Sequence, residues 1–226
     1  MPRPFLKYCG IHSFSDYTVC LESASDFLGF VFYQKSPRHI KPEAIADWVR
    51  RAGQRKKPLV GVFVNPTFDE LRVVLQTAPL DIIQLHGEET PTFVTEVQKT
   101  FHKRVWKAIH HTPGACGLMA QYEHTVDGFV IDCKVKDAWG GTGVRFDWTY
   151  VPDYTEEARR QGVPCFIAGG ITPDNIEKLL AFDPMAIDLA SGIECEGKKS
   201  RRLIQDLERK VGANDETLSR CTRAIR

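Results

Sequence analysis

Short apolar segments recur along the chain with helical patterns between them. Several of these segments, such as residues 27–32 and 59–64, are almost continuously apolar. Strands of this kind are typically covered on both faces, as they are in parallel sheets. The pattern predicts eight strands, at residues 6–11, 27–32, 59–64, 81–85, 104–109, 128–131, 164–168 and 186–189.

The segments between the strands carry apolar stripes at helical spacing and recognisable helix starts. Thr67 and Glu70 form a capping box, and Pro42 suits the first position of a helix. The predicted starts, in chain order, are Pro42, Thr67, Thr90, Thr172 and Ser200. The first helix, around residues 13–24, and the fifth, around residues 116–122, have weaker patterns.

Strand and helix alternate eight times, which is typical of parallel βα units. No linker rich in Gly, Ser or Pro divides the chain. We therefore predict an α/β fold, a single-domain (β/α)8 TIM barrel over residues 1–212, because eight units in about 210 residues suit a compact barrel. A doubly wound open sheet has the same periodicity and is the alternative. We expect residues 213–226, where the pattern stops, to form a loosely ordered C-terminal tail.

Composition and charge limit the kinds of partner. The net charge of +1 over 226 residues provides no strong field for a nucleic acid or a membrane surface. No apolar run approaches the ~18 residues that span a bilayer, and the N-terminus has no apolar signal core. We therefore expect a cytoplasmic protein that acts on a small molecule.

The cysteines indicate neither a disulfide framework nor a zinc site. Their number, seven, is odd, and no Cys-x-x-Cys pair occurs. Cys9 and His12 form a lone Cys-x-x-His without the second pair that zinc requires. We expect most of the cysteines to be small buried apolar residues.

Glycine-rich turns follow the last three predicted strands. In a barrel of this type the active site lies at the carboxyl ends of the strands, and the loops after strands seven and eight often bind phosphate. Glycine allows backbone N–H groups to approach an anion closely. The candidate phosphate residues are Gly141, Thr142, Gly143, Gly169, Gly170, Ser191 and Gly192.

Cys9 and Asp132 form the candidate acid and base pair. Cys9 ends the first strand and Asp132 ends the sixth, so both are expected to reach into one mouth. Lys7 shares a strand face with Cys9, and its ammonium is expected to lower the pKa of the thiol. The other interpretation is an inert buried thiol and a capping carboxylate.

Seven motifs occur in the chain in the order found in one enzyme family. They are residues 7–11, 29–32 with 35–38, 61–65, 81–88, 140–143 with 146–148, 168–171 and 188–194. Together they resemble the phosphoribosylanthranilate isomerases of tryptophan biosynthesis. The resemblance covers the chain from residue 7 to about residue 200 and implies the same barrel fold.

The resemblance implies an Amadori rearrangement without cofactor or metal. We expect the protein to be a monomer or a homodimer. The substrate is N-(5-phosphoribosyl)anthranilate, and the product is 1-(2-carboxyphenylamino)-1-deoxyribulose 5-phosphate. Asp132 matches the general acid, Cys9 the general base, and Arg38 the residue that binds the anthranilate carboxylate through its guanidinium fork. The glycine-rich turns match the phosphate site.

Two other functions stay open. One is another ribose-phosphate barrel enzyme such as indole-glycerol-phosphate synthase, whose chemistry calls for Lys and Glu at the strand ends. The other is a non-catalytic module that binds a sugar phosphate, against which the presence of Cys9, Asp132 and Arg38 together argues.

Overall fold

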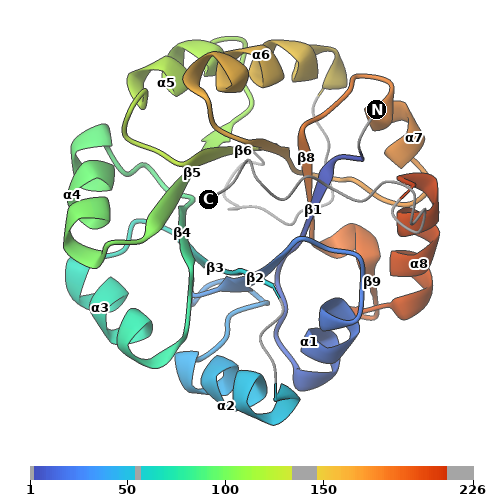
Figure 1. Cartoon of the computed structure of the whole chain (residues 1–226). Helices are drawn as coiled ribbons and strands as arrows, with labels where there is room; N and C mark the ends of the chain where they lie inside the picture. The colour runs from blue at the N-terminus through green and yellow to red at the C-terminus, as the bar shows by residue number, and fades with distance from the viewer. Residues whose placement is uncertain (1–2, 54–56, 134–146, 213–226) are drawn as a thin grey trace.

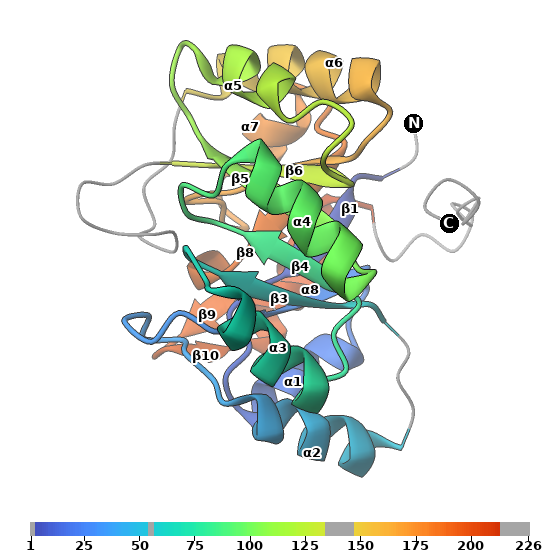
Figure 2. The ribbon, with the colours of Figure 1, turned by 90° about the vertical axis from the view of Figure 1, so that its left-hand side faces the viewer.

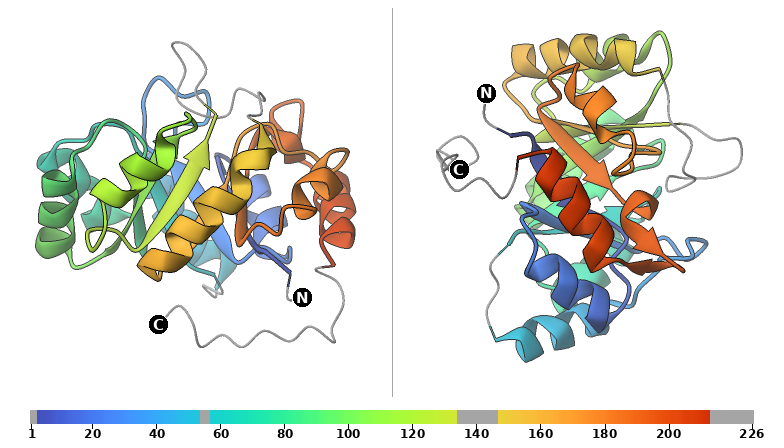
Figure 3. Two further views of the ribbon diagram at one scale, coloured as in Figure 1. Left: turned by 90° about the horizontal axis from the view of Figure 1, so that it is seen from above. Right: turned by 90° about the vertical axis from the view of Figure 1, so that its right-hand side faces the viewer.

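The computed structural model describes residues 3–53, 57–133 and 147–212 of the chain. Eight parallel strands close into a barrel in chain order, with β1 hydrogen-bonded to both β2 and β8. The helices surround the strands on all sides (Figure 1; Figure 3). The predicted (β/α)8 barrel is therefore confirmed, and the open sheet is excluded. The predicted tail at residues 213–226 lies outside the described residues.

The strands and helices follow the predicted order. The strands are β1 Phe5–Tyr8, β2 Phe27–Val31, β3 Leu59–Phe63, β4 Ile82–Leu85, β5 Arg104–His110, β6 Gly128–Asp132, β7 Cys165–Ile167 and β8 Ala186–Leu189. The α-helices are α1 Phe14–Leu21, α2 Pro42–Ala52, α3 Phe68–Thr77, α4 Pro91–Phe101, α5 Ala115–Gln121, α6 Val151–Gln161, α7 Ile176–Leu180 and α8 Arg201–Lys210.

Short elements lie before α6 and between β8 and α8. A 3-10 helix, η1 (Trp148–Tyr150), precedes α6, and a second one, η2 (Ser191–Ile193), follows β8. The antiparallel strands β9 (Glu194–Cys195) and β10 (Lys198–Lys199) come next, and they lie beside α1 (Figure 2). No helix in the described ranges is long and apolar enough to cross a bilayer.

The seventh helix begins later than the sequence predicts. It starts at Ile176 rather than at Thr172 because the intervening residues form a turn. In that turn, the Asn175 side chain accepts a hydrogen bond from the Thr172 N–H at 2.9 Å. Its amide nitrogen donates to the Gly170 carbonyl, also at 2.9 Å. These residues therefore shape the loop after β7 instead of extending the helix.

The apolar residues form two packed layers, one inside the barrel and one between the barrel and the helices. The inner layer contains Phe27, Trp106 and Phe166, whose ring centroids lie 4.5–5.6 Å apart. The outer layer is larger and contains the alternate strand residues together with the inward faces of the helices. Both faces of each strand are thus covered, which accounts for the nearly continuous apolar runs.

Candidate active site

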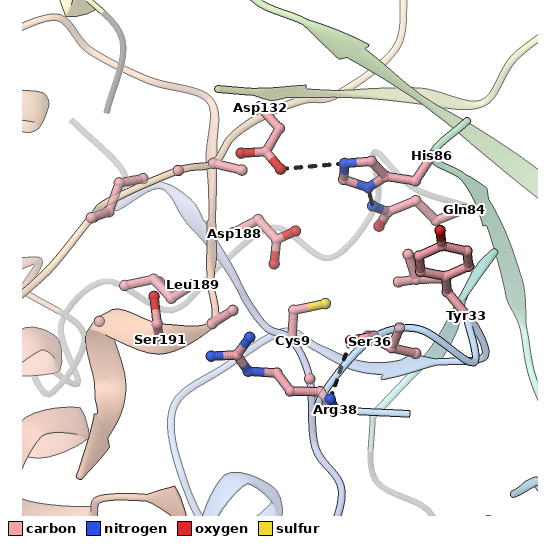
Figure 4. Close-up of a pocket in the computed structure, with 18 of the residues that line it drawn as sticks. Cys9, Tyr33, Ser36, Arg38, Gln84, His86, Asp132, Asp188, Leu189 and Ser191 are labelled. Atoms are coloured by element: carbon pink, nitrogen blue, oxygen red, sulfur yellow. Dashed lines mark hydrogen bonds and ion pairs between the residues drawn. The ribbon is translucent and has the colours of Figure 1, made fainter. Parts of the chain in front are cut away.

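A pocket opens at the carboxyl ends of the strands (Figure 4). The ends of β1, β6 and β8 contribute to it, as do the loops that follow β2, β7 and β8. The structure places these predicted site residues in its lining: Cys9, Arg38, Asp132, Gly169, Gly170, Ser191 and Gly192. The predicted turn of Gly141, Thr142 and Gly143 lies outside the described residues.

The loops after β7 and β8 form one wall of the pocket from backbone atoms. Gly169 and Gly170 have φ angles of 86° and 62°, in the left-handed region that glycine adopts without strain. A Cβ atom on Gly192 would lie 1.8 Å from the Ile171 carbonyl oxygen. The two loops therefore touch backbone to backbone, and only glycine fits at this contact.

The Cys9 thiol points into the pocket from the end of β1 (Figure 4). A Cβ atom on Gly29 of the neighbouring strand would lie 2.8 Å from the Cys9 Sγ, so this glycine makes room for the thiol. Lys7 lies deeper in the barrel and is fully buried. Its Nζ donates to the Asp188 Oδ2 at 2.7 Å, across the β1–β8 pairing.

The net pKa of Cys9 is raised, although Lys7 lowers it as expected. Burial raises the pKa of the thiol most, Lys7 lowers it, and Asp188 raises it. Lys7 acts in the predicted direction, but its charge is shared with Asp188 and does not outweigh desolvation. The pKa of Lys7 is itself raised: burial lowers it, and Asp188 and Cys9 more than compensate. In the free enzyme at neutral pH, Cys9 is therefore mostly a thiol.

Asp132 lies across the pocket from Cys9, beside a buried histidine (Figure 4). The His86 Nε2 is 3.2 Å from the Asp132 Oδ2, without the alignment of a hydrogen bond. The other ring nitrogen of His86 lies 3.1 Å from the amide nitrogen of Gln84. The second carboxyl oxygen of Asp132 accepts a hydrogen bond from the Cys133 N–H at 2.8 Å. The Cys133 N–H thus binds one oxygen of this carboxyl group, and the His86 ring lies beside the other.

The Arg38 side chain enters the pocket from the loop after β2, and its guanidinium is already paired. Its Nε and Nη2 donate to the two carboxylate oxygens of Glu194, at 2.9 and 2.6 Å. These hydrogen bonds raise the pKa of Arg38 above its usual value, despite partial burial. Sequence reasoning assigned no role to Glu194, which lies 156 positions away along the chain.

Other side chains at the strand ends divide between the pocket and the surrounding layer. Gln84 and His86 line the pocket. They lie at the carboxyl end of β4, and this position alone could have identified them from the sequence as candidate pocket residues. Lys107 instead points out of the barrel, where its Nζ pairs with Glu89 at 3.1 Å. His12 is outside the lining and lies 3.4 Å from Asp16 on α1.

Comparison with known proteins agrees with this geometry. The family model described as N-(5'-phosphoribosyl)anthranilate (PRA) isomerase matches residues 6–210. The chain belongs to this family. An N-(5'-phosphoribosyl)anthranilate isomerase from Geobacillus thermodenitrificans (strain NG80-2) is 51% identical over 206 residues, which are 91% of this chain and 93% of that relative.

Two solved structures show the same architecture. One is of mutually generated monomers of the dimeric phosphoribosylanthranilate isomerase from Thermotoga maritima, with a TM-score of 0.76 and 27% identity. The other is a phosphoribosyl anthranilate isomerase in complex with reduced 1-(o-carboxyphenylamino)-1-deoxyribulose 5-phosphate, with a TM-score of 0.77 and 27% identity. Each similarity covers 92% of this chain and 98% of the other.

These similarities confirm the family, and the isomerase activity in tryptophan biosynthesis, that the sequence motifs implied. The two alternatives, a synthase of the indole-glycerol-phosphate type and a non-catalytic sugar-phosphate module, are set aside.

Proposed function

We propose that this pocket converts N-(5-phosphoribosyl)anthranilate to 1-(2-carboxyphenylamino)-1-deoxyribulose 5-phosphate, with Asp132 as general acid and Cys9 as general base. One observation carries the assignment: the Asp132 carboxyl group and the Cys9 thiol line the same pocket at the carboxyl ends of the strands (Figure 4). The pocket also offers a glycine-lined wall for a phosphate and a guanidinium for a carboxylate.

In the first step, Asp132 donates its proton to the furanose ring oxygen. The bond from C1 to that oxygen breaks, and the anthranilate nitrogen forms a double bond to C1, which gives an iminium. The Asp132 carboxylate that remains accepts a hydrogen bond from the Cys133 N–H, and His86 lies 3.2 Å from its other oxygen. These neighbours stabilise the charge that forms on the acid.

In the second step, Cys9 as thiolate removes the proton from C2, and the electron pair moves to give an enolamine. The C2 hydroxyl then becomes a carbonyl as C1 takes up a proton. The raised pKa of Cys9 in the free enzyme means that the bound substrate must help the thiolate to form. A cationic iminium in a pocket of low dielectric does this, and it also acidifies the C2 hydrogen. The proton that the thiol loses passes to solvent, and solvent reprotonates Asp132 at the end of the cycle.

Three parts of the lining hold the substrate in this proposal. The phosphate binds to the backbone of the Gly170 and Gly192 loops, and the carboxylate binds to Arg38. The Asp188 Oδ1 is a buried pocket oxygen with no hydrogen-bond partner among the described residues. We assign it to a ribose hydroxyl, because a buried carboxylate oxygen is costly to leave without a donor.

The test is turnover of the purified chain with phosphoribosylanthranilate, followed by the change in anthranilate fluorescence. The aminoaldose of the histidine pathway, which undergoes the same type of rearrangement, is the comparator. We expect saturable turnover of phosphoribosylanthranilate. Absence of turnover by a folded protein contradicts the proposal.

We also propose a cytoplasmic location, which the biosynthetic family supports. The expected assembly, a monomer or a homodimer, stays a prediction; the similar Thermotoga maritima enzyme is described as dimeric. Light scattering of the purified chain distinguishes the two states.

A further inference from the structure

We propose that Glu194 is a positioning residue that fixes the guanidinium of Arg38 for the carboxylate of the substrate. The proposal rests on the function proposed above. It goes beyond it by explaining why an arginine that must bind a carboxylate is already paired with one. Four features of the described residues carry the argument.

The first feature is how the guanidinium is divided between two tasks. Glu194 takes the Nε and the Nη2 of Arg38, at 2.9 and 2.6 Å. Among the described residues, the Nη1 donates no hydrogen bond, and Arg38 lines the pocket. A bidentate pair fixes the plane of a guanidinium. The pair with Glu194 therefore holds the remaining N–H groups in one orientation.

The second feature is that Glu194 is itself held in place. The Lys199 Nζ donates to the Glu194 Oε1 at 2.7 Å and to the Ala190 carbonyl at 2.9 Å. The Lys199 N–H donates to the Asp16 Oδ1 on α1, at 2.9 Å. The Glu194 carboxylate thus has two cationic partners and is tied to both the β8 loop and α1. It is not a loose group that an incoming carboxylate displaces.

The third feature is the balance of charge. Arg38 and Lys199 are cations, and Glu194 is the anion between them. Burial raises the pKa of Glu194, but the lowering by Arg38 and Lys199 is larger. The net pKa is therefore lowered, and Glu194 is ionised. The three side chains leave one net positive charge. Because the Lys199 side chain is fully buried, Arg38 is the member that presents this charge to the pocket.

The fourth feature is the path of the Arg38 side chain. Gly10 has a φ of 74°, and a Cβ atom on it would lie 2.3 Å from the Arg38 Cδ. The aliphatic part of Arg38 therefore lies directly on the backbone of Gly10, the residue after the proposed base. With the stem held by Gly10 and the head held by Glu194, the site of the carboxylate is fixed relative to Cys9.

The alternative role for Glu194, competition with the substrate carboxylate for Arg38, predicts the opposite change in affinity. If Glu194 only competed with the substrate for Arg38, its neutralisation would strengthen the binding of a carboxylate. If Glu194 positions Arg38, its neutralisation weakens that binding, even though the local charge becomes more positive. The sign of the change in affinity therefore distinguishes the two roles.

The experiment is calorimetric titration with two stable probes. The carboxylated probe is reduced 1-(o-carboxyphenylamino)-1-deoxyribulose 5-phosphate, called the reduced product below. The second probe is the same compound without the carboxyl group. The variant is Glu194→Gln. The control is Glu157→Gln, because Glu157 forms the same kind of bidentate pair with Arg160, at 2.9 Å for both bonds, on the outer helix α6.

The unmodified protein should bind the carboxylated probe more tightly than the other. In Glu194→Gln, we expect the Kd of the carboxylated probe to rise about tenfold or more, the range for a charged hydrogen bond. The Kd of the probe without the carboxyl group should change by less than about twofold. That result would also show that the phosphate wall, the pocket wall formed by the Gly170 and Gly192 loops, is intact. Glu157→Gln should leave both Kd values unchanged.

Three results overturn the proposal. Unchanged or tighter binding of the carboxylated probe by Glu194→Gln makes Glu194 a bystander or a competitor. Equal weakening of both probes makes its role general to the fold. Equal binding of both probes by the unmodified protein removes the premise that Arg38 reads a carboxylate, whereas continued turnover of phosphoribosylanthranilate would still support the isomerase function.

Discussion

The space beside the Cys9 thiol gives a sharp test of its position. In Gly29→Ala, the added Cβ atom would lie 2.8 Å from the Cys9 Sγ and 3.1 Å from its Cα. Ordinary van der Waals contact begins at 3.4 Å, so the sulfur must move by about 0.6 Å, from 2.8 to 3.4 Å, or β1 and β2 must separate. Moving the thiol relieves the contact with the Sγ but not the contact with the Cα, so β1 and β2 must also separate by about 0.3 Å, from 3.1 to 3.4 Å.

The expected effect falls on catalysis more than on binding. A displacement of a reacting group by 1 Å can cost about 10²-fold, so we expect kcat to fall by about ten- to a hundredfold. Overpacking typically costs about 1–3 kcal/mol, so the free energy of unfolding should fall by that amount. The phosphate wall belongs to β7 and β8, and the Kd of the reduced product should therefore stay nearly constant.

The assay combines anthranilate fluorescence for kcat, urea unfolding for stability and calorimetry for binding. Gly117→Ala is the matched control, because a Cβ atom there meets nothing within 4 Å. Gly117 lies inside α5, so this control should be neutral or stabilising by about 1 kcal/mol. If Gly29→Ala keeps full kcat, the position of the thiol does not matter and the reasoning is refuted. A parallel loss of kcat and of binding would show general damage instead.

The remaining predictions concern charge and backbone contact. Lys7 lowers the pKa of Cys9 and Asp188 raises it. The pH at which kcat/KM rises should therefore be higher in Lys7→Met and lower in Asp188→Asn than in the unmodified enzyme. An unchanged profile in Lys7→Met removes Lys7 from the mechanism. Lys7→Met also leaves Asp188 buried without its cation, so urea unfolding should show a loss of about 3–5 kcal/mol. Gly192→Ala must push the two phosphate loops apart at Ile171, so KM should rise about tenfold or more while the folded state persists; an unchanged KM contradicts the phosphate assignment.

The barrel could be predicted from sequence because both faces of its strands are apolar. In β2, for example, Phe27 packs inside the barrel, whereas Leu28 and Phe30 pack under the helices. Capping residues add the helix starts, and the Thr67 capping box is present as predicted. The start of α7 was mistaken because Asn175 satisfies the backbone of the turn that precedes it.

The electrostatics of the site could not be predicted in the same way. Lys7 is two residues from Cys9, but Asp188, which shares its charge, is 181 positions from Lys7. Closure of the barrel brings β8 beside β1 and so creates this pair. Burial, the largest influence on the pKa of Cys9, is likewise a property of the whole fold. The pairs of Arg38 with Glu194 and of Asp132 with His86 also arise only when distant strand ends meet.

The central claim is that Asp132 and Cys9 perform the two proton transfers, and kcat of two variants tests it most directly. Cys9→Ala and Asp132→Asn should each lose about 10²–10⁴-fold in kcat, the usual contribution of a positioned acid or base. Both should bind the reduced product about as tightly as the unmodified enzyme. If both variants, folded and able to bind this compound, turn over phosphoribosylanthranilate at the unmodified rate, the assignment is contradicted.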